Sequence, residues 1–547
     1  MTLSGSVPLP ITPSTSIISP MSQVEVGPIV ATDLQPELGT DGPKVPWPQR
    51  ARSILLWLMV IGAALRILRY LANRSLWLDE AYLADSVLTF SFKQLLTRPL
   101  LYWQAAPPGF LMLQKSAVTL LGTGEYALRL VPLLAGLTSL PLFYGIIRRC
   151  LGPTACVIAM LLFIVLDPLV YYSAESKQYG LDVMFSLAIV WSAMRLRDEP
   201  LSGGRVIAMA GIGILGIGCS HPSVFVLAAA GLALIWEFRR SELRNRLIVI
   251  IILWVGLFAA EYFLFLRPLT HHSGLAAYWA GDYMPYQCLA AIKWLGIELY
   301  GLYHGYATMW LPMVDAAILA TLLGIIRFWR RDRAMLAMLM LPLIFTLAAA
   351  AVHAYPFGSR LVLFLVPALV VLIGAGGAMI WESFVPGRRI IPSLILASII
   401  LPTAARAVYY VLIPAKREEI RPMLEYVREH KKSGDVLYLF HISEIPFRYY
   451  QDRFGLEENR GGLADMTWIF GQSGDSDVSV YRADLARLRG KGRVWVLITH
   501  PRAVGGIDEE QLFPAILDQW GRQIDRVNAF NACAILYEMK SATAAGK

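Results

Sequence analysis

The sequence predicts a polytopic α-helical membrane protein that ends in a small α/β domain. The chain has 547 residues, of which 56% are hydrophobic and only 16% are charged, and its mean hydropathy is +0.53. It contains repeated apolar runs of the length that crosses a bilayer, which is about 20 residues. After about residue 414 charged residues become frequent and the apolar runs become short. We therefore expect a membrane part at 48–413 and an α/β domain at 414–547.

The apolar runs predict about eleven transmembrane helices. They lie near 53–71, 128–147, 153–170, 179–194, 206–220, 222–238, 247–266, 311–328, 334–352, 361–381 and 390–412. A further run at 108–121 is short and is closely followed by Gly122 and Gly124. We expect this run to form a helix that lies in the outer membrane interface.

The arginines predict the orientation. The net charge of +9 could suggest a nucleic-acid partner, but much of the arginine lies in short loops between apolar runs, where it sets topology. A cytoplasmic N-terminus puts these clusters on one side: Arg50/Arg52, Arg148/Arg149, Arg195/Arg197/Arg205, Arg239/Arg240/Arg244/Arg246, Arg327/Arg330/Arg331/Arg333 and Arg388/Arg389. The segments 72–127, 171–178, 267–310, 353–360 and everything after 413 then lie outside. We expect a bacterial inner (plasma) membrane protein without a nucleic-acid partner.

Both ends of the chain differ from the membrane part. Residues 1–47 are rich in Ser, Thr, Pro and Gly and lack the basic and then apolar opening of a signal peptide, so they predict a disordered cytoplasmic tail. At the other end, 435–441, 493–500 and 533–539 are typical of buried strands, and 416–432 and 508–521 have helical periodicity. These elements predict the extracytoplasmic α/β domain.

The first outer segment, 72–127, carries an acidic pair, Asp79 and Glu80, just beyond the first apolar run. Carboxylates at the edge of a bilayer cost desolvation energy, so they favour a chemical role as acid, base or orienting group. The alternative is a solvated loop or a cap on a helix that begins at Ala81. Pro107 and Pro108 of the same segment open an aromatic-rich apolar run, which is equally consistent with an interfacial anchor.

Charged residues also lie at two later outer turns. The first holds Glu175, Lys177 and Tyr179, where the alternative is a structural salt bridge. The second ends at Arg360, which opens a long uncharged run and could equally orient the chain. A cation at the edge of the membrane is what a lipid phosphate requires. Asp167 and Asp182 are weaker acid candidates, because Asp167 is followed by a proline that more simply ends a helix.

Taken in order on one side of the membrane, these segments resemble the polyprenyl-phosphate-sugar-dependent glycosyltransferases of the C superfamily, such as protein O-mannosyltransferases and lipid A aminoarabinose transferases. The family's Asp-Glu matches Asp79-Glu80, and its His-Pro-Pro-like motif matches Ala106-Pro107-Pro108. Its Gly-x-x-Glu-x-x-x-Arg motif matches 122–129, and its Ser-x-Glu-x-Arg-x-Tyr motif matches 173–179. The chain departs from the pattern at Ala106, and at Lys177, where an arginine is usual and a bidentate phosphate contact is lost.

The resemblance implies an inverting transfer of a sugar from a polyprenyl phosphate to an acceptor, which is a protein, lipid or glycan, at the outer face. Asp79 would accept the acceptor's proton, Glu80 would orient Asp79 or the acceptor, and Glu175 would be a second acid. Lys177 and Arg360 would hold the departing phosphate, and Tyr179, Pro107 and Pro108 would contact substrate.

Three histidines of the outer segment 267–310, His271, His272 and His304, could bind a divalent metal, but their spacing is irregular and solvated histidines are the alternative. No cofactor is otherwise expected. Two rival functions stay open: a transporter or lipid flippase, and an assembly protein that kept the fold without the activity. Charges at the outer ends of the apolar runs, rather than at their centres, favour the enzyme.

Overall fold

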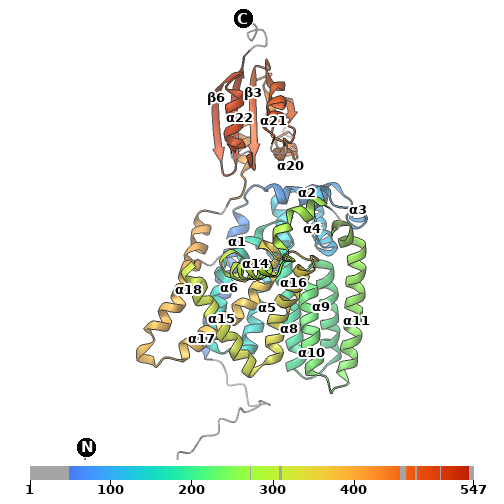
Figure 1. Ribbon diagram of the computed structural model, residues 1–547, viewed down its shortest axis with the longest axis vertical. Helices are drawn as coiled ribbons and strands as arrows, with labels where there is room; N and C mark the ends of the chain where they lie inside the picture. The colour runs from blue at the N-terminus through green and yellow to red at the C-terminus, as the bar shows by residue number, and fades with distance from the viewer. Residues whose placement is uncertain are drawn as a thin grey trace, which may run out of the picture. The chain divides into compact units, whose positions relative to one another are not determined.

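The computed structural model describes residues 48–270, 273–306, 311–414, 416–455, 463–474, 477–504 and 507–540. The predicted tail at 1–47 lies outside these ranges. All of the predicted apolar runs are helical in the structure (Figure 1). The corresponding helices are α1 (Gln49–Leu71), α5 (Glu125–Cys150), α6 (Pro153–Val165), α7 (Asp167–Tyr171), α8 (Tyr179–Asp198), α9 (Gly203–Cys219), α10 (Ser223–Glu237), α11 (Leu243–Glu261), α15 (Leu311–Arg331), α16 (Arg333–Ala351), α17 (Val366–Glu382) and α18 (Ile390–Leu412).

Among the described residues, seven helices are long and apolar enough to cross a membrane, and the bent pair of α6 with 167–174 makes an eighth candidate. The polytopic helical class is thus confirmed, but the count is lower than the predicted eleven. Helices α9 and α10 have only 17 and 15 residues, short of the roughly 20 that a span needs. The bend of 58° falls at Pro168, which has no N–H to continue the hydrogen bonding of α6.

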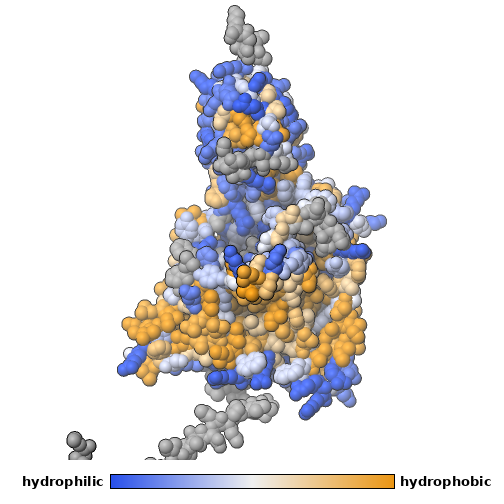
Figure 2. Space-filling view, in the orientation of Figure 1, coloured by the Kyte–Doolittle hydropathy of each residue, from blue (hydrophilic) through white to orange (hydrophobic). Residues whose placement is uncertain are grey.

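The helical part has a broad apolar surface on the face that Figure 2 shows. Figure 2 shows hydrophobic side chains covering these helices and hydrophilic side chains gathered elsewhere. Large exposed apolar residues on α1 and α11, such as Trp57, Val60 and Val249, contribute to it. Exposure of this kind is unfavourable in water and favourable in lipid, so the chain is an integral membrane protein.

Several arginines that were predicted to share one side pair with acids at neighbouring helix ends. Glu199 after α8 pairs with Arg149 of α5 and Arg205 of α9, and Arg197 pairs with Asp332 before α16 at 2.8 Å. These contacts place one end of α5, α8, α9 and α16 at a common level, as the orientation requires. Which side of the membrane that level faces stays a prediction.

The segment 72–127, which was predicted to be outer, is largely helical. It contains α2 (Leu78–Thr89), α3 (Phe92–Thr97), the short 3-10 helix η1 (Leu101–Trp103) and α4 (Pro108–Leu121). The predicted helix at 108–121 is therefore confirmed. Pro107 is its N-cap and Pro108 occupies its first turn, where the missing N–H costs nothing. The helix ends at Gly122, whose φ of 89° is readily available to glycine.

Short helices lie in and next to the later segments that were predicted to be outer. These are η2 (Tyr172–Ala174), the π-helix η3 (Tyr262–Leu266), α12 (Arg267–Thr270), α13 (Ser273–Tyr278), η4 (Ala280–Asp282), α14 (Cys288–Gly301), the π-helix η5 (Leu302–Tyr306) and η6 (Ser359–Leu365). A further short helix, η7 (Pro386–Arg388), lies between α17 and α18.

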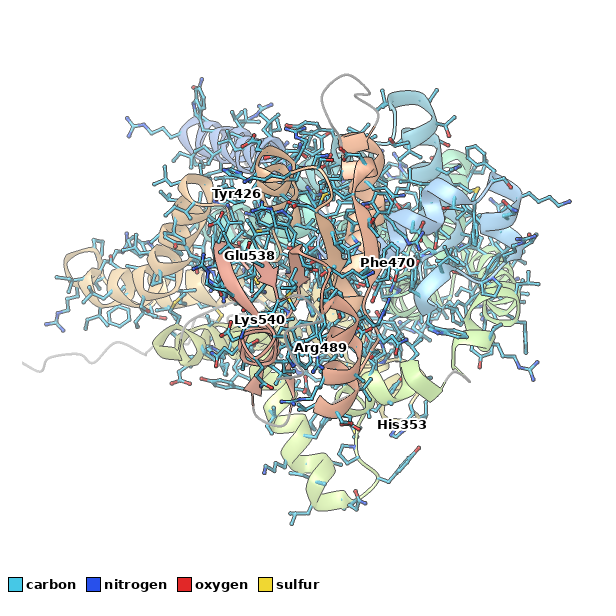
Figure 3. The ribbon with its side chains drawn as sticks, turned by 90° about the horizontal axis from the view of Figure 1, so that it is seen from above. His353, Tyr426, Phe470, Arg489, Glu538 and Lys540 are labelled. Carbon is cyan, nitrogen blue, oxygen red and sulfur yellow. The ribbon has the colours of Figure 1, made fainter. Side chains whose placement is uncertain are left out.

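The C-terminal part contains a five-stranded mixed sheet in the order β2-β1-β3-β7-β6. Strands β2 (Thr467–Phe470), β1 (Val436–Leu439) and β3 (Arg493–Thr499) are parallel, and β7 (Ala532–Met539) and β6 (Gly521–Ala529) are antiparallel to their neighbours. Tyr426 and Phe470 lie toward opposite edges of this sheet (Figure 3). Strands β4 (Ala503–Val504) and β5 (Ile507–Asp508) form a separate small hairpin.

Helices cover both faces of the sheet. Because side chains alternate along a strand, Val436 and Tyr438 of β1 face α21 (Val478–Leu485) and α22 (Glu509–Leu517). Leu437 and Leu439 face α19 (Ile420–His430) and α20 (Glu444–Gly455). The predicted strands β1, β3 and β7 and helices α19 and α22 are confirmed, and together they establish the small mixed sheet domain. The 3-10 helices η8 (His441–Ser443), η9 (Leu463–Asp465) and η10 (Ala486–Leu488) complete it.

Candidate active site

Asp79 lies where three segments that were predicted to be outer meet. It belongs to the first turn of α2, where a carboxylate is favoured by the helix dipole. Its Oδ1 lies 3.0 Å from Lys177 Nζ, and its Oδ2 lies 2.7 Å from an Nη of Arg360. The structure thus brings together an acid and two cations that are separated by 98 and 281 positions in the sequence.

The charges around Asp79 determine its protonation. Burial raises the pKa of Asp79, but the positive charges of Lys177 and Arg360 outweigh burial, so the pKa lies below its ordinary value. For Lys177, burial lowers the pKa more than the Asp79 carboxylate raises it. Asp79 is therefore an ionised carboxylate at neutral pH, and its basicity is suppressed while both cations remain paired with it.

Each cation has a further capacity for binding an anion. Lys177 Nζ donates a second hydrogen bond to Gln104 Oε1, at 2.5 Å. The Arg360 guanidinium packs over the rings of Trp77 and Tyr179, with centroids at 5.6 and 5.5 Å, and this contact fixes its plane. Its Nε is buried and has no hydrogen-bond partner among the described residues. The Nε–H of Arg360 is therefore available to donate a hydrogen bond to an oxyanion.

Glu80 has a different environment from Asp79. It is fully buried, and Arg129 donates from Nε to Oε1 at 2.9 Å and from Nη2 to Oε2 at 2.7 Å. The backbone N–H of Ser176 also donates to Glu80 Oε1, at 2.7 Å. Burial raises the pKa of Glu80, but the positive charges of Arg129 and Arg74 lower it by more than burial raises it, so the pKa lies below its ordinary value. Glu80 is a buried anion that joins the first outer segment to the turn carrying Lys177.

Glu175 is also buried, and its Oε2 lies 3.4 Å from Arg74. Its Oε1 has no hydrogen-bond partner among the described residues. Arg74 packs over the ring of Tyr171 at 4.3 Å, which holds the guanidinium between the two carboxylates, Glu80 and Glu175. Asp167 lies elsewhere, 3.7 Å from Arg406, so it does not join this group.

Pro107 and Pro108 start α4, as described above, and the residues just before them reach the site. Gln178 donates to the carbonyl of Ala105 at 3.4 Å, and Gln104 contacts Lys177. A rigid helix start therefore fixes the position of Gln104. Direct contact of either proline with a substrate stays a prediction.

The C-terminal domain contacts the residues just before Asp79. Glu419 accepts a hydrogen bond from Ser75 Oγ at 2.9 Å, and Glu418 accepts one from the backbone N–H of Leu78 at 3.2 Å. The Tyr450 hydroxyl accepts from the N–H of Leu76 at 2.9 Å. Three of the four residues at 75–78 are thus hydrogen-bonded to one domain, which limits how far Asp79 can move.

Sequence reasoning did not assign roles to several residues that shape the site. Arg129 ends the Gly-x-x-Glu-x-x-x-Arg motif at 122–129, and this motif could have indicated a role for it. Its partner Glu80 is 49 positions away in the sequence. Arg74 and Gln104 stand beside predicted residues without a motif of their own. Glu418 and Glu419 lie where the membrane part gives way to the α/β domain, and nothing local indicates their partners.

The metal expectation has no support from the described residues, among which no three His, Cys, Asp or Glu side chains are grouped as a metal site. His271 and His272 lie outside the described ranges, and His304 is exposed.

Comparison with known proteins shows a similarity to one family over part of the chain. Residues 105–264 match the sequence profile of the dolichyl-phosphate-mannose-protein mannosyltransferases. The chain is a membrane glycosyltransferase, and its residues 105–264 are similar to this family. The predicted resemblance and enzyme class are thereby confirmed, and the match favours them over a transporter or flippase. No curated protein sequence matches the chain.

Two solved structures of membrane glycosyltransferases are similar to this glycosyltransferase. AglB from Archaeoglobus fulgidus, an oligosaccharyltransferase solved with an inhibitory peptide and a dolichol phosphate, is 12% identical, with 89% of this chain and 74% of that chain covered and a TM-score of 0.50. ArnT from Cupriavidus metallidurans, solved with undecaprenyl phosphate, is 10% identical, with 88% and 98% covered and a TM-score of 0.48. The AglB similarity indicates a shared fold.

Proposed function

We propose that this glycosyltransferase moves a sugar from a polyprenyl-phosphate donor to an acceptor at the outer face of the membrane, with inversion at the anomeric carbon. The observation that carries the proposal is the contact of one ionised carboxylate, Asp79, with two cations, Lys177 and Arg360. A base beside a binding site for a phosphate leaving group is what a single displacement requires.

The donor phosphate would replace Asp79 as the partner of the two cations. Arg360 already has a buried Nε without a partner among the described residues, and its ion pair with Asp79 is made through an Nη, so the Nε can donate to a second anion. Once Lys177 and Arg360 neutralise the phosphate, the pKa of Asp79 rises toward its ordinary value, because the charges that lower it are shared. Donor binding would therefore make Asp79 a better base.

In the transfer step, the acceptor's oxygen or nitrogen attacks the anomeric carbon while Asp79 accepts its proton. The bond from the anomeric carbon to the phosphate oxygen breaks, and its electron pair leaves with the polyprenyl phosphate. Lys177 and Arg360 stabilise that negative charge. One displacement inverts the configuration. Glu80 and Glu175 would keep the surrounding segments in place, and Glu175 remains the candidate for a second acid.

The isoprenoid tail requires an apolar channel next to the cations. On the same segment as Arg360, Phe364, Leu365 and Pro367 line a small cavity of about 30 Å³ together with residues of α8, α10 and α16. The cavity is almost entirely apolar, and it lies in the part of the chain that is surrounded by lipid. We infer that the first isoprene units of the donor pack along this apolar surface, since the cavity itself has the volume of about one water molecule.

The proposal is tested with purified protein, radiolabelled polyprenyl-phosphate sugars and membrane extracts. Label should leave the lipid with the wild-type protein, and the product's anomeric configuration should be opposite to that of the donor. The Asp79→Asn variant serves as the inactive control. Label that stays on the lipid for every sugar tested would reject the function, and retained configuration would reject the single displacement.

A further inference from the structure

A second polar cluster lies at the outer ends of four helices. Asp182 of α8, Ser220 and His221 of the turn between α9 and α10, Ser223 at the start of α10, and Glu261 at the end of α11 compose it. His221 Nδ1 lies 3.1 Å from Glu261 Oε1, and the hydroxyl of Ser220 lies beside the carboxyl of Asp182. None of the contacts described above for Asp79 involves these residues.

Most polar atoms of this cluster are buried without a hydrogen-bond partner. Within the described ranges, this holds for Asp182 Oδ1, Ser220 Oγ, His221 Nε2, Ser223 Oγ and Glu261 Oε2. The exposed fractions of Asp182, Ser220 and Ser223 are 3%, 0% and 0%. Native proteins pair nearly all buried polar groups, because an unpaired one loses the free energy of its bond to water. So many unpaired atoms in one place indicate that polar groups of a ligand, or water, complete them.

The types of side chain indicate what ligand fits. Carboxylates accept hydrogen bonds, serine hydroxyls both donate and accept, and the free ring nitrogen of His221 does either according to its tautomer. A cluster that contains both hydrogen-bond donors and acceptors suits hydroxyl groups, because a hydroxyl both donates and accepts hydrogen bonds. The group does not hold three ligands arranged for a metal among the described residues. A polyhydroxylated ring is therefore the ligand that the chemistry favours.

The position of the cluster links it to the cations. Asp182 follows Tyr179 by three residues on α8, so both lie on the same helix face with a rise of about 4.5 Å between them. Tyr179 packs under the Arg360 guanidinium, and Tyr355 lies near both Tyr179 and Asp182. Phe225 contacts Tyr355 at a centroid distance of 5.3 Å. Aromatic faces of this kind pack against the C–H faces of sugar rings.

The start of α4 closes the cluster on a further side. A Cβ on Gly109 would meet Cys219 Sγ at 2.5 Å and the Gly218 carbonyl oxygen at 2.6 Å. The segment with Pro107 and Pro108 therefore packs directly on the end of α9, one residue before Ser220. This contact gives the two prolines a role in shaping the cluster.

We propose that Asp182, Ser220, His221 and Glu261 line a subsite that binds the hydroxyl groups of the donor's sugar. The inference rests on the proposed function, because it takes the phosphate to be held at Lys177 and Arg360. A sugar linked to a phosphate at that place comes within one helical turn of Asp182. The cluster would thus select the sugar, while the two cations bind the phosphate that every donor carries.

The test compares equilibrium binding of undecaprenyl phosphate with that of its mannosyl, glucosyl and 4-amino-arabinosyl esters to the purified full-length protein. Wild type should prefer at least one ester over the bare phosphate. Asp182→Ala should lower that preference by about tenfold and Ser220→Ala by several-fold, without a change in affinity for bare undecaprenyl phosphate. Thr403→Ala on α18 is the matched control, because Thr403 is a buried polar residue whose hydroxyl already donates to Ile399.

Ser220→Ala keeps the test valid if Asp182→Ala folds poorly, since it removes a single hydroxyl and leaves the Asp182 carboxyl in place. Variants that keep the wild-type preference would show that ordered water alone fills the cluster, and the proposal would be wrong. It would also be wrong if wild type preferred no ester, or if the variants lost the bare phosphate as well. A wild-type protein that binds no member of the panel would instead reject the proposed function.

Discussion

Replacing Asp79 with asparagine tests the role of the carboxylate directly. Asparagine keeps the size of the side chain and removes its basicity, so the acceptor's proton has no place to go. General-base catalysis contributes about 10² to 10⁴ in rate, which corresponds to about 3–5 kcal/mol in the activation barrier. We expect turnover to fall by that factor, measured as label transferred per folded molecule.

The same substitution should strengthen the binding of lipid phosphate. In the free enzyme, the phosphate competes with Asp79 for Lys177 at 3.0 Å and for Arg360 at 2.7 Å. Asparagine has no charge, so both cations become available without displacing an anion. Affinity for undecaprenyl phosphate should rise by up to about tenfold. Loss of turnover together with tighter lipid binding is a combination that misfolding does not produce.

Asp85→Asn is the matched control. It lies on the same helix, α2, and its carboxylate accepts hydrogen bonds from Thr89 and Tyr102 instead of pairing with Lys177 or Arg360. Turnover and lipid affinity should stay within about twofold of wild type, as for an ordinary surface substitution. Near-normal turnover of Asp79→Asn would refute its assignment as the base, and weaker lipid binding would refute the competition between Asp79 and phosphate.

The remaining predictions concern the cations, the buried acid, the tail and the topology. Lys177→Ala and Arg360→Ala should each cost about 1–3 kcal/mol in donor binding or turnover, and Lys177→Arg should be tolerated; unchanged donor kinetics in both alanine variants would place the phosphate elsewhere. Glu80→Gln leaves Arg129 as a buried unpaired charge, so it should lower the free energy of unfolding by about 3–5 kcal/mol. The measurement is a fall in the thermal unfolding temperature. Because the pKa of Glu80 lies below that of the unfolded chain, the stabilisation is present at neutral pH and should be lost as the pH falls below about 4; a flat acid profile would contradict this. A chain that ends near residue 413 should insert into membranes but lose acceptor transfer more than donor binding, and full activity would assign the tail another role. Reporter fusions near 200, 242 and 331 should be cytoplasmic and those near 275 and 500 external, and a cytoplasmic position for 500 would invert the proposed site.

The sequence predicted the membrane helices because apolar periodicity and length are local properties. It overestimated the number of spans where helices are short or bent, as for α9, α10 and the α6–α7 pair. In the C-terminal domain, strands β1, β3 and β7 are continuous apolar runs that lie at the centre of the sheet. Strand β6 was not predicted, because it is an edge strand whose residues are mostly charged or polar.

The residues around Asp79 were partly predictable for a related reason. Charges at the outer ends of apolar runs are expensive to place, so Lys177 and Arg360 stood out without knowledge of the fold. The pairing of each acid with its cation was not predictable, because it depends on how segments far apart in the sequence pack. Glu80 and Arg129, and Ser75 and Glu419, are partners of this kind.

The acidic pair also shows how helix geometry separates two chemically equivalent neighbours. Adjacent residues on an α-helix point about 100° apart, so Asp79 and Glu80 cannot share an environment once α2 packs against the membrane helices. Glu80 points into the protein, where its side chain is 0% exposed and satisfied by Arg129. Asp79 points toward Lys177 and Arg360 and keeps 15% of its side chain exposed. A sealed carboxylate with fixed partners can hold segments together but cannot reach a substrate, whereas one whose partners also attract phosphate can exchange them when the donor arrives. The dipeptide therefore supplies both the anchor of the loop and the group that we propose to react, and the direction of each side chain decides which is which.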